Sequence, residues 1–285
     1  MMIDLLQLLV YGVVLGCIVT LGAIGVSLVF GILGFANFAH GDLMTVGAYL
    51  ALVFVGLGWP LHVAFLGALA GTAVVAVLVD QFLYRHLRRR SSVVLVISSL
   101  GVALMLRSLI QLVWGPDNQV YQPGIQLPIE FLGLRIKPNQ IVIVGGAVVL
   151  VAALHVFLSR TKMGKAMRAT ADNRDLAQTA GIDIGRVILW TWIIGALLAA
   201  AAGIFLAIDT RLHPFMGRNI LLAIFAAAIL GGIGKPYGAI AGGLTIGIAE
   251  EMSTLVLSPA YKSAVAFAIM VAMLIFRPTG LFGGR

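Results

Sequence analysis

The 285-residue chain is 61% hydrophobic and only 11% charged, with a mean hydropathy of +1.07. Because about a quarter of the residues in soluble domains are charged, this composition excludes an ordinary soluble protein. Apolar runs of about 18 residues or more recur along the sequence, which predicts a polytopic, all-α membrane protein. Outer-membrane barrels are excluded, because their strands are short and alternate in polarity.

The formal net charge of +8 comes from basic residues that cluster in two loops. Positive-inside topology explains such clusters in a membrane protein more simply than a nucleic-acid-binding patch does. The single cysteine, Cys17, lies in an apolar run, which excludes a disulfide framework and a thiolate metal site.

The first apolar run, Leu5 to Phe35, is longer than the roughly 20 residues that cross a bilayer. Gly12 and Gly16 have the spacing that lets neighbouring helices pack closely. The start of the chain lacks the basic residues of a cleavable signal peptide, so we expect this span to be retained.

A polar interruption follows in FANFAHGDLMTVGAYLA, where Asn37, His40 and Asp42 stand between two apolar runs. Two interpretations are open. The segment is either a short polar turn at the cytoplasmic surface, or a broken or re-entrant helix that faces a water-lined path. His40 and Asp42 also suggest a metal site or a proton relay, but two ligands without a third are weak evidence for a metal.

The spans expected next are Met44 to Leu57, Leu61 to Val79, Val93 to Val113 and Ile141 to Leu158. Arg107, in the third of these, is expected to reach the interface or to pair within the bundle. Gln81 to Ser92 is strongly basic and reads as a cytoplasmic loop. Trp114 to Gln140 is long and poor in basic residues, and is therefore expected outside.

The longest strongly polar segment, Ser159 to Arg186, divides the chain into two halves. Its charges cannot lie in hydrocarbon. Its composition predicts one or two short helices outside the membrane, with Asp172 capping the second helix and Gly181 ending it. We expect this segment to be a contact surface for another protein.

The second half begins with a span over Val187 to Ile208 and contains another interrupted apolar stretch, Ile220 to Ile248. There GGIGKP resembles a phosphate loop only faintly, because Pro236 stands where Ser or Thr is needed, so we reject nucleotide binding. Two interrupted stretches in corresponding places predict a duplicated bundle with a path between its halves.

Lys262 to Phe276 is the last expected span, and at least one of Glu250 and Glu251 should reach water or Lys262. The count of crossings is about eight or nine. It places the N-terminus outside and the C-terminus inside, in a single transmembrane domain over residues 1–285.

Four blocks occur in a fixed order: GVSLVFGILGFANFAHGDLMTVGAYLA, RATADNRDLAQTAGID, AAAILGGIGKPYGAIAGGLTIGIAEE and FRPTGLFG. Together they resemble the permease subunit of branched-chain amino acid ABC importers, the smaller of the two paired permease types. The resemblance implies a bacterial inner-membrane assembly with a second related permease and two cytosolic ATPases that bind the ATP. It also implies a periplasmic or lipid-anchored substrate-binding protein, and no cofactor or catalytic residue in this chain.

The resemblance also implies roles by position. The polar segment, residues 159–186, would contain the coupling segment that seats in a groove of the ATPase, although it departs from the EAA loop of better-studied importers. Its candidate coupling residues are Gly164, Ala169, Asp172, Asn173, Ala180 and Gly181. The candidates for the substrate path, from the two broken-helix blocks, are Asn37, His40, Asp42, Gly231, Gly232 and Gly234.

The function expected from these features is translocation of branched-chain amino acids, or related small polar solutes, by alternating access. ATP would be bound by other chains, because this chain has no Walker motif. The alternative is an ion-coupled secondary transporter that uses His40, Asp42, Glu250 and Glu251. An intramembrane enzyme would need a metal motif or a nucleophile–base set, and we find neither. A structural scaffold would explain the packing glycines but not the polar interruptions.

Overall fold

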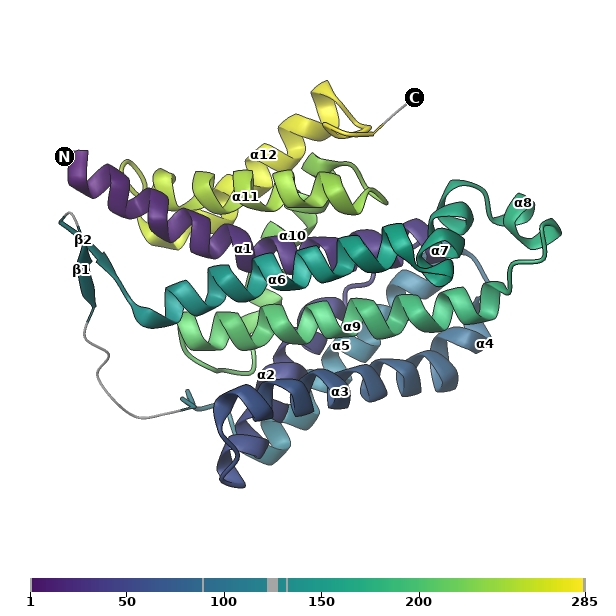
Figure 1. Cartoon of the computed structure of the whole chain (residues 1–285), viewed down its shortest axis with the longest axis horizontal. Coiled ribbons are helices and arrows are strands. Elements are labelled where there is room, and N and C mark those ends of the chain that lie inside the picture. The colour runs from purple at the N-terminus through teal and green to yellow at the C-terminus, as the bar shows by residue number, and fades with distance from the viewer. Residues whose placement is uncertain (1, 89, 122–127, 132, 284–285) are drawn as a thin grey trace.

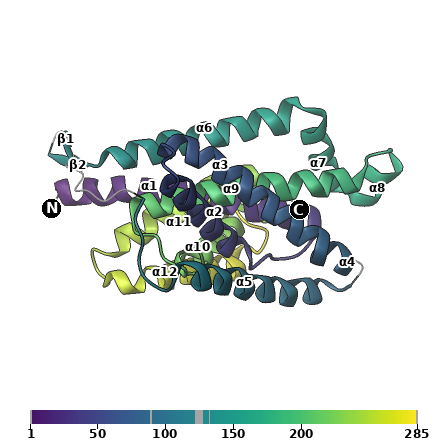
Figure 2. The same ribbon diagram turned by 90° about the horizontal axis from the view of Figure 1, so that it is seen from below.

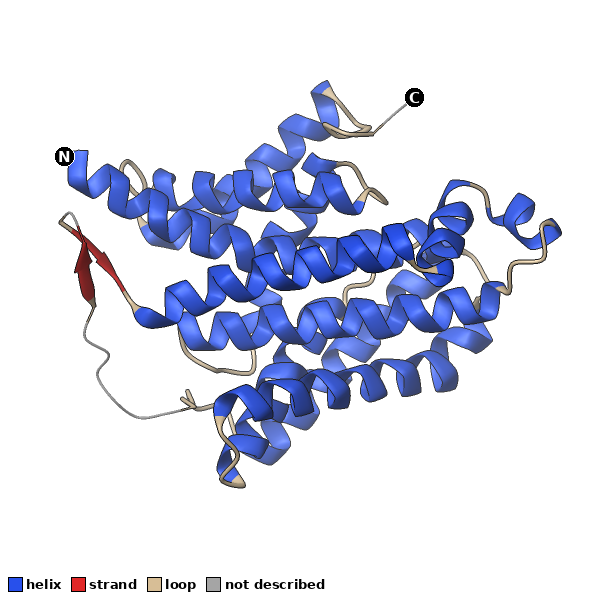
Figure 3. Cartoon of the chain, in the orientation of Figure 1, coloured by secondary structure: helices blue, strands red, loops and turns tan. Residues whose placement is uncertain are grey.

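The computed structural model describes residues 2–88, 90–121, 128–131 and 133–283. Helices make up nearly all of its regular structure (Figure 3). Within these residues, six helices are long and apolar enough to cross a membrane, and two shorter apolar helices, α2 (His40–Gly56) and α10 (Met216–Gly231), accompany them. The predicted class, an all-α polytopic membrane protein, is confirmed.

The predicted spans agree with the observed helices to within a few residues. Before the central loop the chain forms α1 (Met2–Leu33), α2, α3 (Leu61–Val79), a π-helical turn (Asp80–Tyr84), α4 (Arg85–Leu87) and α5 (Ser92–Trp114). After it come β1 (Ile129–Phe131), β2 (Leu134–Ile136), α6 (Pro138–Arg160), α7 (Lys162–Asp172), α8 (Arg174–Thr179), α9 (Ile184–Asp209), α10, α11 (Pro236–Ser253), a 3-10 turn (Pro259–Tyr261) and α12 (Lys262–Phe276).

The bundle has two distinct ends. Figure 1 shows α3, α6 and α9 side by side along the long axis, with the N-terminus and the two strands at one end and α4, α7 and α8 at the other. The view from below (Figure 2) keeps the same elements at the same ends. The two basic stretches of the sequence therefore lie at one end of the molecule, as the positive-inside pattern predicts.

The basic stretch after α3 is helical where a loop was predicted. The helix continues past Val79 through the π-helical turn into α4 and ends only at Leu87. A π turn adds a residue to the helical repeat and so changes the direction of the side chains that follow. Tyr84, the last residue of this turn, is buried at 1% exposure.

The long loop between α5 and α6 contains an antiparallel hairpin that the sequence analysis did not predict. β1 pairs with β2, with Ile129 opposite Ile136. The hairpin is fixed to the first helix by Gln7, whose Nε2 donates to the Arg135 carbonyl at 2.9 Å and whose Oε1 accepts from the Arg135 amide at 2.8 Å. These bonds satisfy part of the edge of a very short strand.

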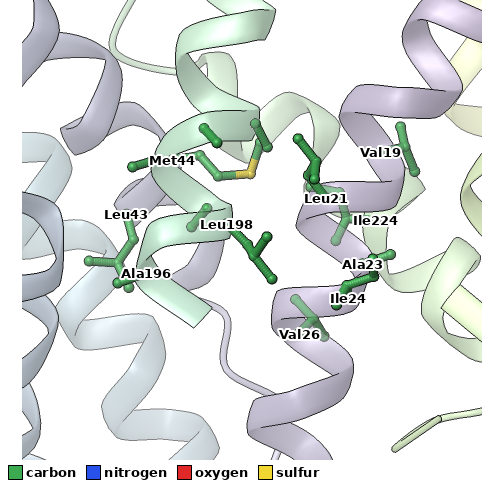
Figure 4. Close-up of a cluster of buried hydrophobic side chains, with 14 of the residues drawn as sticks. Val19, Leu21, Ala23, Ile24, Val26, Leu43, Met44, Ala196, Leu198 and Ile224 are labelled. Atoms are coloured by element: carbon green, nitrogen blue, oxygen red, sulfur yellow. The ribbon is translucent and has the colours of Figure 1, made fainter. Parts of the chain in front are cut away.

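The core lies around α1 and α9. In the most apolar 18-residue stretch of each of these helices, 83% is buried. Figure 4 shows side chains from α1, α2, α9 and α10 meeting there. They include Val19, Leu21, Ala23, Ile24, Val26, Leu43, Met44, Ala196, Leu198 and Ile224. By contrast, only 22% of the most apolar stretch of α6 and 11% of the span Pro259–Phe276, which includes α12, are buried, so both helices expose a large apolar surface.

The helices α1 and α11 touch backbone to backbone. A Cβ added to Gly12 would lie 2.8 Å from the Ile248 Cα, and one added to Gly16 would lie 3.0 Å from the Leu244 Cα. Larger residues would force the two helices apart, so the predicted packing role of these glycines is confirmed.

Candidate functional site

The first polar interruption is a helix break whose polar side chains are buried. α1 ends at Leu33 and α2 begins at His40. Asn37, His40 and Asp42 are each 1% exposed. A polar turn at the cytoplasmic surface would expose these side chains, so the structure favours a broken helix over a surface turn.

Asn37 holds the backbone of this first break. Its Oδ1 accepts hydrogen bonds from the Ala39 amide at 3.1 Å and from the Tyr84 hydroxyl at 3.3 Å. The Tyr84 ring stacks on Trp192 of α9 with their centroids 5.0 Å apart, and lies 5.4 Å from the Phe35 ring. No pattern in the sequence marked Tyr84 as a partner of Asn37, because the π-helical turn that contains Tyr84 was not predicted.

Asp42 is bound by Arg107 of α5. The Arg107 Nε donates to Oδ1 at 3.0 Å, and Nη2 donates to Oδ2 at 2.9 Å. Asp42 also lies in the first turn of α2, where the helix dipole favours an anion. The guanidinium lies 5.7 Å from the centre of the Phe215 ring. The expected pairing of Arg107 within the bundle is confirmed.

This pairing changes the reading of Asp42 as a metal ligand or proton carrier. A carboxylate bound bidentately by arginine has little capacity left for an ion. Among the described residues there is also no group of three or more side chains of the types that bind metals. The geometry therefore gives Asp42 a role in holding α2 to α5.

The first turns of α2 and α10 meet at Gly41 and Gly217. A Cβ added to Gly41 would lie 2.6 Å from the Gly217 carbonyl oxygen, and the Gly217 amide donates to the Thr45 hydroxyl at 3.1 Å. The His40 ring fills a space beside Gly25 of α1, where an added Cβ would lie 2.6 Å from Cε1. The first break thus joins α1, α2 and α10.

The second break separates α10 from α11 at the predicted glycines. Gly232 and Gly234 have φ angles of +105° and +81°, a region that glycine adopts at little cost. Gly231 lies against the backbone of Gly238 with no space for a Cβ, which folds α11 tightly onto the end of α10. Gly234 packs on Gly31 of α1.

The segment after α12 closes this second break. The Leu281 amide donates to the Leu230 carbonyl at 2.8 Å, and the Phe282 amide donates to the Gly231 carbonyl at 3.2 Å. The last carbonyls of a helix have no partner within it, so these bonds satisfy the end of α10. The terminal block FRPTGLFG therefore has a structural role that the sequence analysis did not assign.

The polar segment forms two short helices, as predicted. The Asn173 Oδ1 accepts from the Leu176 amide at 3.0 Å and caps α8. The prediction that Asp172 caps this helix was wrong, because Asp172 is the last residue of α7. Gly181 follows α8 with a φ of +82°, as expected for a glycine that ends a helix.

Most of the predicted coupling residues are open to contact. The exposed ones are Ala169, Asp172, Asn173, Ala180 and Gly181. Gly164 is buried instead, and a Cβ there would overlap the backbone of Leu158, so this glycine lets α7 fold back on α6. Met167, 1% exposed, holds α7 to the bundle. The segment is thus fixed on one side and exposed on the other.

A cavity of about 390 Å³ lies between α7 and the second break. Asp172 and Gly234 both line it, so the structure brings together one predicted coupling residue and one predicted path residue. The residues of the first break do not line this cavity.

The other end of the polar segment borders the π-helical turn. A second cavity of about 390 Å³ there is lined by Asp80 and Arg88 on one side and by Asp183 and Arg186 on the other. Arg88 donates a hydrogen bond to Asp80, and Arg186 pairs with Asp183 at 3.1 Å. The segment therefore lies close to the turn that carries Tyr84 to the first break.

The chain matches a family of known proteins over most of its length. The family described as "Branched-chain amino acid transport system / permease component" matches residues 8–274. The chain is 35% identical to the high-affinity branched-chain amino acid transport system permease protein LivH of Escherichia coli K12, over 98% of this chain and 95% of that protein. It is 33% identical to the corresponding permease protein BraD of Pseudomonas aeruginosa, with the same coverage.

A solved structure shares the fold. PsaBC from Streptococcus pneumoniae, in complex with Fab, matches with a TM-score of 0.55 at 13% identity, over 97% of this chain and 92% of that one. At that identity the likeness concerns the fold alone. The family match covers nearly the whole sequence and includes both helix breaks and the polar segment. The chain belongs to the family of permease components of branched-chain amino acid transport systems.

Proposed function

We propose that this chain is the permease subunit of an ATP-driven importer of branched-chain amino acids or related small polar solutes in a bacterial inner membrane. The observation that carries the proposal is the family match over residues 8–274, together with relatives of that name aligned over nearly their whole length. The N-terminus would lie outside and the C-terminus inside. The chain itself would catalyse no reaction.

In the assembled importer, this chain would contact a second related permease, cytosolic ATPases, a periplasmic substrate-binding protein and the bilayer. Two ATPases would hold the ATP, and this chain would need no cofactor. The little-buried helices α6 and α12 offer apolar surface for lipid or for the second permease.

The exposed side of α7 and α8 would be the surface that an ATPase moves. One end borders the second break, where Asp172 shares a cavity with Gly234. The other end borders the π turn, where Asp183 shares a cavity with Asp80, and Tyr84 of that turn donates to Asn37 of the first break. A ligand or nucleotide shifts a two-state protein only through contacts that differ between the states. Displacement of this segment would change packing at both breaks, which supplies such contacts.

The ion-coupled alternative has less support. It needs a carboxylate that is free to bind and release an ion within the bundle. Of the three carboxylates named for it, Asp42 is bound by Arg107, and Glu251 accepts from Lys262 at 2.5 Å, which also agrees with the expected pairing of a glutamate with that lysine. Only Glu250, 5% exposed, has no ion pair among the described residues. The family match likewise supports the importer.

Gly181→Val tests coupling through the polar segment. A Cβ at Gly181 would meet nothing within 4 Å, but its φ of +82° is strained for a branched residue by about 1–3 kcal/mol. The change therefore alters the backbone after α8 without filling space. In proteoliposomes holding the complete importer and internal ATP, we expect uptake of radiolabelled leucine to fall by about fivefold or more.

Gly101→Val is the matched control. Gly101 is an exposed residue of α5 where an added Cβ also meets nothing within 4 Å, and its φ is not positive. Its uptake should stay near that of the wild type. Normal uptake by an assembled Gly181→Val complex would contradict the coupling role. Uptake without ATPases, driven by an ion gradient, would contradict the importer.

A further inference from the structure

The cavity between α7 and the second break has the chemistry of an amino-acid site. Its volume, about 390 Å³, is within the range of about 300–1,000 Å³ that small-molecule sites occupy. One wall is apolar and includes Leu28, Ile32, Leu158, Met167 and Phe282. Charged side chains of both signs also line it: Arg168, Asp172 and Lys235. A zwitterion with an apolar side chain requires this combination.

These charged groups are available to a ligand. In the part of the chain that the structure describes, none of Arg168, Asp172 and Lys235 forms an ion pair. Arg168 and Asp172 come from α7, whereas Lys235 precedes α11, so a molecule bound among them would contact both helices.

A buried polar group in the same cavity also lacks a partner. Ser27 of α1 lines the cavity, is 0% exposed, and its hydroxyl has no hydrogen-bond partner among the described residues. A buried hydroxyl without a partner costs about 1–3 kcal/mol. A polar group of a bound molecule would remove that penalty.

The helix α11 starts on this cavity. Lys235 is its N-cap residue, Pro236 is its first residue, and no side chain caps it. The free N–H groups and the dipole at a helix start favour a carboxylate. The carboxylate of the ligand would lie at this helix start near Lys235, its ammonium near Asp172, and its side chain on the apolar wall.

We propose that this cavity binds a free amino acid with an apolar side chain from the cytosolic side, and that binding slows import. The inference rests on the proposed function, because a branched-chain amino acid is then the product released on that side. A ligand that contacts α7 and α11 together stabilises the arrangement described here and opposes their relative movement. Import would decline as the product accumulates.

The test uses proteoliposomes with the complete importer, ATP in the lumen, and the binding protein with radiolabelled L-leucine outside. The lumen is preloaded with unlabelled L-leucine or with leucinamide, which has no carboxylate. Luminal L-leucine should reduce the initial uptake rate by about threefold or more, and leucinamide should have little effect. Each variant is compared with its own rate in vesicles with an empty lumen.

Lys235→Gln and Ser27→Ala should each raise the luminal leucine concentration at which uptake is half inhibited. For Lys235→Gln the increase should be about tenfold, equivalent to about 1.4 kcal/mol. Lys165→Gln is the matched control, because Lys165 is exposed on α7 but does not line the cavity. Equilibrium dialysis of radiolabelled L-leucine against the importer without its binding protein should show saturable binding that Lys235→Gln weakens to the same extent.

The outcomes separate the two proposals. Normal ATP-driven uptake with no effect of luminal leucine would overturn the cavity site and leave the importer intact. Inhibition that persists unchanged in both cavity variants would place the effect in another subunit and also overturn the site. Absence of ATP-driven leucine uptake with an empty lumen would instead overturn leucine as the substrate in the proposed function.

Discussion

The ion pair between Asp42 and Arg107 should contribute strongly to the stability of the bundle. Asp42→Asn preserves the size of the side chain but leaves Arg107, 7% exposed, without its counterion. Removal of one partner of a buried pair costs about 3–5 kcal/mol. Since about 1.4 kcal/mol is tenfold, the ratio of folded to unfolded protein should fall more than about a hundredfold.

The assay is reversible unfolding in mixed micelles as the fraction of denaturing detergent rises, followed by circular dichroism. Glu130→Gln is the control, because the Glu130–Arg135 pair has a separation of 3.3 Å but side chains 68% and 71% exposed. Exposed pairs contribute about 1 kcal/mol or less. The double variant Asp42→Leu/Arg107→Leu should recover much of the loss, since apolar replacement of both partners is often neutral.

Two results would refute this reasoning. If Asp42→Asn lowers the free energy of unfolding no more than Glu130→Gln does, burial does not strengthen the pair. If the double variant is as unstable as Asp42→Asn, the loss comes from packing around the α2–α5 contact rather than from an unpaired charge.

Two further substitutions test a helix contact at the first break and the cap of α8. Gly217→Ala should destabilise the protein by about 1–3 kcal/mol in the same unfolding assay, because its methyl group would overlap the Gly41 carbonyl, whereas Gly101→Ala should have little effect. Asn173→Ala should remove the cap of α8 at a cost of about 1 kcal/mol. Amide hydrogen exchange should then be faster in α8 and unchanged in α7. Equal acceleration in both helices would contradict a local cap.

The fold class and the positions of both breaks could be predicted because their causes are local. A run of apolar residues reports a span, and α12 has the bounds predicted for it, Lys262–Phe276. Clustered glycines indicate positive φ angles and close backbone contacts, and Gly232 and Gly234 do have positive φ angles. The end of α8 at Gly181 was predictable for the same reason.

The side chains that hold the first break could not be predicted, because their partners are distant in sequence. Arg107 and Asp42 are 65 positions apart, and Tyr84 and Asn37 are 47 apart. An arginine in an apolar span either reaches the interface or pairs within the bundle, so pairing was one of two expected outcomes, but the sequence did not indicate which residue is the partner of Arg107. Tyr84 had no such signal, since its direction depends on the π turn. The cap of α8 was missed by one residue because Asp172 and Asn173 are both good caps.

The two breaks differ in how firmly they are held, and this difference bears on where the bundle can move. At the first break a buried ion pair, the Asn37–Tyr84 hydrogen bond and the Gly41–Gly217 contact act together. The second break has two glycines at positive φ beside an open cavity, and its backbone bonds to the segment after α12. Packed contacts resist small displacements, whereas a cavity leaves room for them. We therefore expect movement of α7 to be taken up mainly at the second break, where a bound amino acid would oppose it most directly.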